Sequence, residues 1–157
     1  MANDTAQNAS GENSHRLENS LLASDLEFLT ARARAVGTRT ANKWLEPCGI
    51  KARDFAILSL VSTNEQPSQR ELAEFLSLDA SQVVALVDSL EKKNLLERRT
   101  DPRDRRSNIL VSTKEGMALF EKAQVAIDNA REESLEGLTP AEREELKRLL
   151  TLIAFNG

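Results

Sequence analysis

The sequence is poor in the residues on which most catalytic and metal sites depend. Its 157 residues include one histidine, one cysteine and no tyrosine. It also lacks a glycine-rich phosphate-binding loop and a cluster of metal-ligating side chains, and its many carboxylates fall on the exposed faces of predicted helices. We therefore predict that the protein is not an enzyme and needs no metal or cofactor.

Long apolar runs and paired cysteines are also missing. No apolar run approaches the roughly 20 residues that a membrane-spanning helix needs. The first residues, MANDTAQNASGENSH, contain Asp and Glu and no apolar stretch, so they do not predict a signal peptide. Residues 1–16 are predicted to be a disordered tail, and the single Cys48 excludes an internal disulfide framework. These absences favour a cytoplasmic protein.

Aromatic residues make up only 4% of the chain, so Leu, Ile, Val and Ala must fill the core of a single domain. The net charge is -4 and the pI is near 5.2, yet the segment RRTDPRDRRSN at 98–108 concentrates arginine. Pro102 excludes a helix at this point, and the ILVST that follows is typical of a strand. A basic turn between two strands, in an acidic chain, has to face a partner.

Two short helices precede this basic turn. Ser68 with Glu71 forms a predicted capping box, and Asp79 with Gln82 repeats the device in its Asx form. The two helices therefore start one residue after each cap, and SLD joins them, which is the spacing of a helix-turn-helix. The second helix is predicted to bury Val83, Leu86, Val87 and Leu90 and to expose Ser81, Gln82, Ala85, Asp88, Ser89 and Lys92.

The remaining segments complete a winged helix. LLERR and SNILVST flank the arginine turn as a predicted hairpin. One long amphipathic helix is predicted from Leu17 to about Trp44, and two more follow the hairpin, capped by Thr113 and by Thr139. The fold class is mainly α with a small β part (α+β): a winged helix-turn-helix between terminal dimerisation helices. The predicted regions are a tail (1–16), an N-terminal dimerisation helix and loop (17–50), a DNA-binding region (51–113) and C-terminal dimerisation helices (114–157).

The sequence resembles the MarR family, the multiple antibiotic resistance regulators. The residues that carry the resemblance are WLEPCGIKARDFAILSLV, SQRELAEFLSLDASQVVALVDSLEKKNLLER, DPRDRRSNILVSTKEG and LTPAEREELKRLL, within 20–155. The wing signature, Asp-x-Arg-Ser after DP, falls on Asp104, Arg106 and Ser107. The resemblance implies a homodimeric, cytoplasmic regulator of transcription, most often a repressor. It also implies a recognition helix in the major groove of a pseudo-palindromic operator, a wing arginine in the minor groove, and release by a small-molecule effector or an oxidant.

The chain departs from the usual pattern of this family at two positions of the recognition helix. Gln82 replaces a common Thr or Ser, and Ala85 replaces a common Arg. Losing that arginine removes a guanine or phosphate contact, which leaves open a helical interaction protein that has kept the winged helix without binding DNA. Asn94 replaces a common Gly after this helix and can adopt the left-handed conformation of a helix end.

The candidate DNA contacts lie at three places, and each also has a purely structural interpretation. Arginines of the turn suit phosphates and a narrow minor groove, although they could be a solvated loop. Residues at the start of either helix could serve as caps alone, or could bind phosphate or a base edge. The candidates are Ser68, Gln69, Arg70, Ser81, Gln82, Ala85, Arg103, Asp104, Arg105 and Arg106, with Asp104 expected to brace Arg106 from within the loop.

Three further residues are candidates for an effector or redox site. Trp44 and Phe55 could line a ligand pocket, although core packing is the simpler interpretation. Cys48 is expected to be a small buried hydrophobic residue, because a redox switch needs an accessible thiol with a lowered pKa.

Overall fold

A computed structural model describes residues 16–155, so the predicted tail lies almost wholly outside the described residues. The chain forms two compact units that divide between Thr38 and Arg39.

The N-terminal unit does not contain the continuous helix predicted from Leu17. A short 3-10 helix, η1 (Leu21–Ser24), precedes α2 (Leu26–Leu45), which runs into the second unit. The Ser20 hydroxyl accepts a hydrogen bond from the Ala23 N–H at 3.3 Å, and Asp25 is extended, with φ -74° and ψ 130°. Oδ1 of Asp25 then accepts from the Phe28 N–H at 2.8 Å, which caps a new helix. The prediction of one continuous helix was wrong because the apolar periodicity continues across Ser20 and Asp25, two capping residues at which the helix is interrupted.

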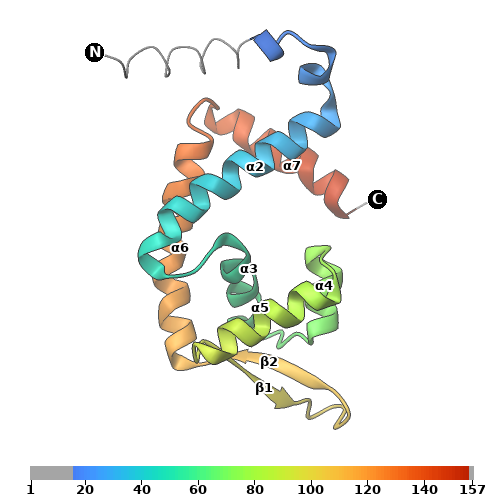
Figure 1. The fold of residues 1–157 in the computed structure, drawn as a ribbon, viewed down its shortest axis with the longest axis vertical. Helices are drawn as coiled ribbons and strands as arrows, with labels where there is room; N and C mark the ends of the chain where they lie inside the picture. Colours follow the sequence, from blue (N-terminus) through green and yellow to red (C-terminus); the bar gives the residue numbers. More distant parts are fainter. Residues whose placement is uncertain (1–15, 156–157) are drawn as a thin grey trace, which may run out of the picture. The chain divides into compact units, whose positions relative to one another are not determined.

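The larger unit contains the helix-turn-helix and the hairpin (Figure 1). Its elements in order are the end of α2, η2 (Glu46–Cys48), α3 (Ala52–Val61), α4 (Gln69–Leu76), α5 (Ala80–Lys92), β1 (Leu96–Thr100), β2 (Asn108–Ser112), α6 (Lys114–Ser134) and α7 (Pro140–Phe155). All of the predicted elements of this unit are therefore present. The mainly helical winged helix-turn-helix is confirmed.

An aliphatic core holds this unit together, as the low aromatic content predicts. α3, α5 and the hairpin supply most of its buried side chains, which include Leu45, Ile57, Leu58, Leu72, Val83, Val87, Leu90, Leu96 and Leu110. Leu86, predicted to be buried with them, is only half-buried. At the edge of the core, the rings of Phe55 and Phe120 stack with their centroids 5.9 Å apart. The core fixes α5 with one face inward and the opposite face free.

The caps position the two helices of the helix-turn-helix. The predicted box at Ser68 is present: Glu71 N–H donates to Ser68 Oγ at 3.2 Å, and Ser68 N–H donates to Glu71 Oε2 at 2.7 Å. Asp79 is the N-cap of α5, but its side chain makes no cap hydrogen bond, so the predicted Asx box is wrong. Asn94 adopts the expected left-handed conformation, with φ 57°, directly after Lys93, the C-cap of α5.

The wing is tied directly to the segment that precedes α4. β1 and β2 pair antiparallel from Leu96 opposite Ser112 to Thr100 opposite Asn108. In the middle of β2, the Leu110 N–H donates to the carbonyl oxygen of Pro67 at 2.8 Å. This hydrogen bond joins the hairpin to the residue just before the N-cap of α4.

Candidate DNA-binding surface

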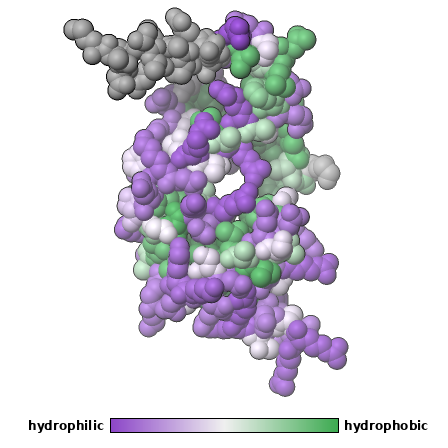
Figure 2. Space-filling view, viewed as in Figure 1, coloured by the Kyte–Doolittle hydropathy of each residue, from purple (hydrophilic) through white to green (hydrophobic). Residues whose placement is uncertain are grey.

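The larger unit carries all ten candidate DNA contacts of the sequence, on the start of α4, on α5 and on the loop between β1 and β2. Eight of them are exposed: Arg70, Ser81, Gln82, Ala85, Arg103, Asp104, Arg105 and Arg106. Ser68 and Gln69 are half-buried. The loop forms a hydrophilic projection of this unit, at the lower end of Figure 2.

A side chain outside the candidate set, Arg98 on β1, joins the wing to both helices. Its guanidinium donates to Gln69 Oε1 at 3.0 Å and to Asp88 Oδ1 at 2.5 Å, and it also pairs with Glu91. The Arg98 backbone N–H donates to the other oxygen of Glu91 at 3.2 Å. The Arg98 side chain is only 24% exposed. Burial alone would lower the pKa of Arg98, but the hydrogen bonds and charges of Asp88 and Glu91 raise it above its ordinary value.

The candidates at the start of α4 are already engaged within the fold. The Ser68 hydroxyl belongs to the capping box, and the Gln69 carbonyl oxygen receives Arg98. Arg70 forms an exposed ion pair with Glu74 one turn later, at 2.8 Å. The pKa of Glu71 lies below its ordinary value because Ser68 donates two hydrogen bonds to it, and the charge of Arg103 adds to the effect. Of these residues, only Arg70 is available to phosphate, because its exposed ion pair with Glu74 is weak.

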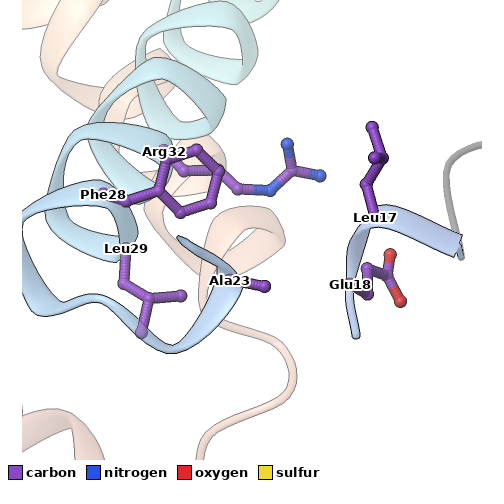
Figure 3. A pocket seen from close by; sticks show the side chains of 6 residues that line it. All are labelled: Leu17, Glu18, Ala23, Phe28, Leu29 and Arg32. Atoms are coloured by element: carbon purple, nitrogen blue, oxygen red, sulfur yellow. The ribbon is translucent and has the colours of Figure 1, made fainter. Parts of the chain in front are cut away.

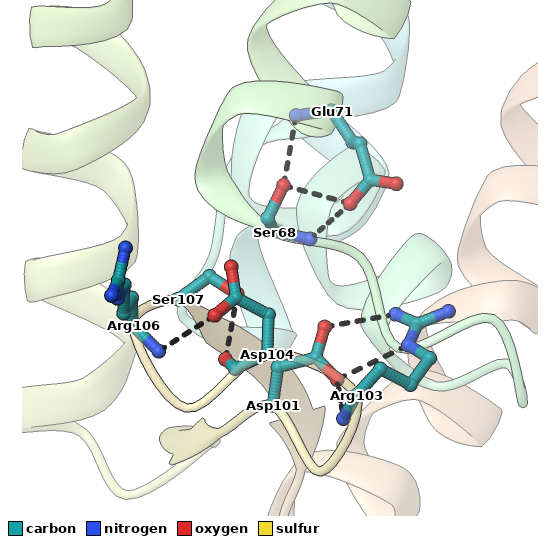
Figure 4. Close-up of polar contacts among 7 residues, drawn as sticks. All are labelled: Ser68, Glu71, Asp101, Arg103, Asp104, Arg106 and Ser107. Atoms are coloured by element: carbon teal, nitrogen blue, oxygen red, sulfur yellow. Dashed lines mark hydrogen bonds and ion pairs between the residues drawn. The ribbon is translucent and has the colours of Figure 1, made fainter.

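The turn holds one of its arginines and leaves two available (Figure 4). Asp101, which is 8% exposed, receives the Arg103 guanidinium on both carboxylate oxygens at 3.1 Å, and these hydrogen bonds lower the pKa of Asp101. Asp104 Oδ1 accepts from the backbone N–H of Arg106 at 3.0 Å. Asp104 therefore braces Arg106 from within the loop, as expected, and does so through the backbone N–H of Arg106. Within residues 16–155, the guanidinium groups of Arg105 and Arg106 have no hydrogen-bond or ion-pair partner.

The outward face of α5 is neutral over its first two turns. Ser81, Gln82 and Ala85 are exposed there, and so is Val84, at 42%. Asp88, the first charged residue on this face, is held by Arg98, and the first cation is Lys92 in the last turn. Sequence reasoning missed the exposure of Val84, because a valine beside buried Val83 resembles a core residue.

The three candidate effector or redox residues have structural partners. Phe55 stacks on Phe120, and Cys48 is half-buried at the edge of the core. Trp44 Nε1 donates to Glu133 Oε2 at 2.7 Å, and Lys43 pairs with the same carboxylate at 3.1 Å. The Trp44 hydrogen bond, followed by that of Lys43, lowers the pKa of Glu133.

Trp44, Cys48 and Phe55 do not line either of two cavities that the described residues form. One, of about 300 Å³, is in the N-terminal unit, where Leu17, Glu18, Ala23, Phe28, Leu29 and Arg32 line it (Figure 3). The other, of about 380 Å³, is in the larger unit, lined by Leu60, Thr63, Glu65, Pro67, Glu71, Leu72 and Phe75. Both volumes fall at the lower end of the range of small-molecule sites.

Two kinds of feature are not found in the described part of the chain. No group of three or more His, Cys, Asp or Glu side chains among residues 16–155 could hold a metal ion. No helix in the same range combines the length and the apolar character needed to cross a membrane.

The chain has relatives of known structure. A family model described as MarR family matches residues 50–108. A MarR-family transcriptional regulator from Rhodococcus sp. RHA1 is 33% identical, with a TM-score of 0.81 over 88% of this chain and 98% of its own. CouR from Rhodococcus jostii RHA1, bound to p-coumaroyl-CoA, is 31% identical, with a TM-score of 0.78 over 87% of this chain and 96% of its own. A cysteine-to-serine mutant of MarR from E. coli, in complex with operator DNA, is 26% identical, with a TM-score of 0.75 over 82% of this chain and 92% of its own. With a relative this similar over nearly its whole length, the chain belongs to the MarR family of transcriptional regulators.

Proposed function

We propose that the protein is a sequence-specific DNA-binding repressor of transcription that acts as a homodimer on a pseudo-palindromic operator. The observation that carries the proposal is the pair of arginines, Arg105 and Arg106, that the described structure leaves without partners at the tip of the wing. An arginine at a loop tip suits a phosphate or a narrow minor groove. The E. coli relative in complex with operator DNA supports this proposal.

Three parts of the larger unit contact DNA in this proposal: α5, the loop of the wing and the start of α4. The outward face of α5 enters the major groove, where Gln82 reads a base edge and Ser81 contacts a base or a phosphate. The wing reaches the neighbouring minor groove with Arg106, and Arg105 contacts phosphate. Arg70, at the start of α4, adds a contact to the backbone. Phosphate contacts fix the position of the protein, and α5 supplies the sequence preference.

A second copy of the chain accounts for apolar surface in each unit. In the N-terminal unit, Leu17, Leu21, Leu22 and Leu26 are 57–93% exposed, and apolar surface gathers over this segment (Figure 2). On α7, Leu149, Leu150, Leu152 and Ile153 are 43–66% exposed. Soluble monomers avoid contiguous apolar patches of this kind, so both stripes belong to a dimer interface.

A small molecule is the proposed effector. The relative CouR was crystallised with p-coumaroyl-CoA, and each unit of this chain contains a cavity of suitable volume. Trp44 and Phe55 line neither of these cavities, so they stay candidates only for a separate ligand site. Oxidation of Cys48 is a weaker alternative, because the thiol is half-buried at the edge of the core.

A salt titration tests DNA binding. Affinity for duplex DNA should fall steeply as salt rises, with a log–log slope that shrinks by roughly one for each phosphate contact removed. We expect Arg105→Ala to reduce the slope and Arg106→Ala to reduce affinity most at A·T-rich flanks. Arg99→Ala is the control, because Arg99 pairs with Glu97 on the same strand. An affinity for duplex DNA that does not change with salt would instead identify a helical interaction protein.

A further inference from the structure

The outward face of the recognition helix carries an exposed apolar side chain where charged groups are expected. Val84 is 42% exposed on α5 (Ala80–Lys92), while the neighbouring Val83 and Val87 are fully buried in the core. A single exposed valine is ordinary on a protein surface. This one stands beside Ala85, however, so methyl groups occupy two adjacent positions of the surface proposed to meet base edges.

The first two turns of this face hold no cation that would select guanine. Guanine is read mainly by Arg or Lys, and the only cation on α5 before its C-cap is Lys92, in the last turn. Arg98 does not fill the gap, because Gln69, Asp88 and Glu91 occupy its guanidinium. Its charge also neutralises Asp88, the carboxylate that would otherwise repel DNA from this face. The first two turns therefore present a hydroxyl, a carboxamide and methyl groups.

The helical geometry arranges these groups as a central row and two flanks on the outward face of α5, so that each can contact a different base pair in the groove. At 3.6 residues per turn, Ser81 and Ala85 form the central row of the outward face, with Gln82 on one flank and Val84 on the other. The two central side chains are small, so the helix axis can come close to the base pairs. Gln82 is exposed, and no side-chain partner engages its carboxamide within the described residues.

We propose that each operator half-site is read through A·T base pairs, with the methyl groups of Val84 and Ala85 packed on thymine C5-methyl groups and Gln82 paired with an adenine. The inference rests on the proposed function, since it concerns the sequence that the DNA-binding surface prefers. The chemistry is complementary: apolar side chains contact the thymine methyl, and Gln is bidentate to adenine N6 and N7. Sequence specificity at these positions thus comes from apolar contacts and from the carboxamide of Gln82, and the arginines of the wing supply the positive charge that attracts DNA.

Modified bases test the two contacts atom by atom. Selection of the full-length protein on a random duplex pool gives its preferred site, which should contain thymine and adenine in each half. Each thymine is then replaced by deoxyuridine, which lacks only the methyl group. We expect affinity to fall about three- to fivefold at one or two thymines per half-site, as for the loss of one buried methyl contact. For Gln82, 7-deazaadenine removes only the N7 acceptor and should weaken binding at one adenine.

Matched variants assign each contact to a side chain. In Val84→Ala, the penalty for deoxyuridine should disappear at one thymine and persist at the other. Val125→Ala, which truncates a 61% exposed valine on α6, should leave the whole pattern unchanged. In Gln82→Ala, the penalty for 7-deazaadenine should disappear. Selection of G·C pairs, or binding that is indifferent to every deoxyuridine, overturns this inference while leaving DNA binding intact; a protein that binds no duplex contradicts the proposed function itself.

Discussion

At the scale of single residues, Arg98 links the wing to both α4 and α5. It is the only side chain of the described wing strands that hydrogen-bonds to both α4 and α5. A point charge cannot reproduce three simultaneous contacts, so Lys is not an equivalent replacement.

We therefore predict that Arg98→Ala lowers the free energy of unfolding by about 1–3 kcal/mol, because Asp88 and Glu91 lose their partner in a half-buried site. Arg98→Lys should recover only part of that loss. DNA affinity should fall further than stability explains, since the freed Asp88 carboxylate lies on the face proposed to meet DNA. Chemical denaturation and a DNA titration measure the two effects. Arg99→Ala changes the same charge on the next residue, and an equal effect there would contradict the brace.

The arginines of 98–108 are alike in sequence but have four different roles in the structure. Arg98 braces the helices, Arg99 pairs with Glu97 on its own strand, Arg103 is held by Asp101, and Arg105 and Arg106 stay available. The sequence could predict that the cluster lies on a wing, because the turn and strand signals are local. It could not predict which arginine is engaged, because Arg98 is paired with Asp88 and Glu91 through the tertiary packing of β1 against α5.

At the scale of elements, local signals predicted the boundaries well where a side chain caps a helix. Ser68, Thr113 and Thr139 each accept from a backbone N–H at the predicted helix start. The two wrong predictions of helix boundaries also concern capping residues. Ser20 and Asp25 are also caps, and they interrupt a segment whose apolar spacing predicts one helix. Asp79 begins α5 without a side-chain bond, so a capping residue type does not guarantee a cap.

The start of α6 depends on a glycine that sequence reasoning did not single out. A Cβ on Gly116 would overlap the backbone carbonyl oxygen of Leu95 and lie 2.7 Å from Ser112 Oγ. Neither the carbonyl of Leu95 nor the strand that follows it can move without shifting the wing. α6 can therefore pack closely on the hairpin only without a side chain at this position.

We expect Gly116→Ala to lower the free energy of unfolding by about 1–3 kcal/mol, the usual cost of overpacking a buried site. Gly37→Ala is the matched control, since Gly37 is also in a helix but nothing lies within 4 Å of its added Cβ. That change should raise stability by about 0.5–1 kcal/mol through helix propensity. Thermal unfolding of both variants decides the matter: if they shift the midpoint in the same direction, the close approach at Leu95 is not as described.

At the scale of the whole molecule, the family and the fold class were predictable from the sequence, and the regions 1–16, 17–50, 51–113 and 114–157 stay predictions. The chain forms two compact units that divide inside α2, between Thr38 and Arg39. Such a division is invisible in the sequence, because helical periodicity continues through it. The apolar stripes could be predicted from their spacing, but what covers them could not, since nothing in the spacing of one chain identifies the partner surface.

The apolar stripe of α7 is predicted to hold the dimer together, and the dimer is predicted to bind the operator. Ile153 is 66% exposed on α7, and a buried charge at that position would oppose association. We expect the wild-type chain to sediment with the mass of two chains at micromolar concentration, and Ile153→Glu to sediment as one. Val84→Glu, which places the same charge on α5, should remain dimeric while losing DNA affinity.

Operator geometry supplies an independent check on the same dimer. Two recognition helices on one face of the duplex lie roughly 34 Å, or about 10 bp, apart. Inserting about half a helical turn between the half-sites places the second one on the opposite face, so the tight complex should be lost. Ile153→Glu should bind both operators equally weakly, because a single subunit recognises only one half-site. Tight binding that survives the insertion in the wild-type protein would mean that the two half-sites are not read by a rigid two-fold dimer.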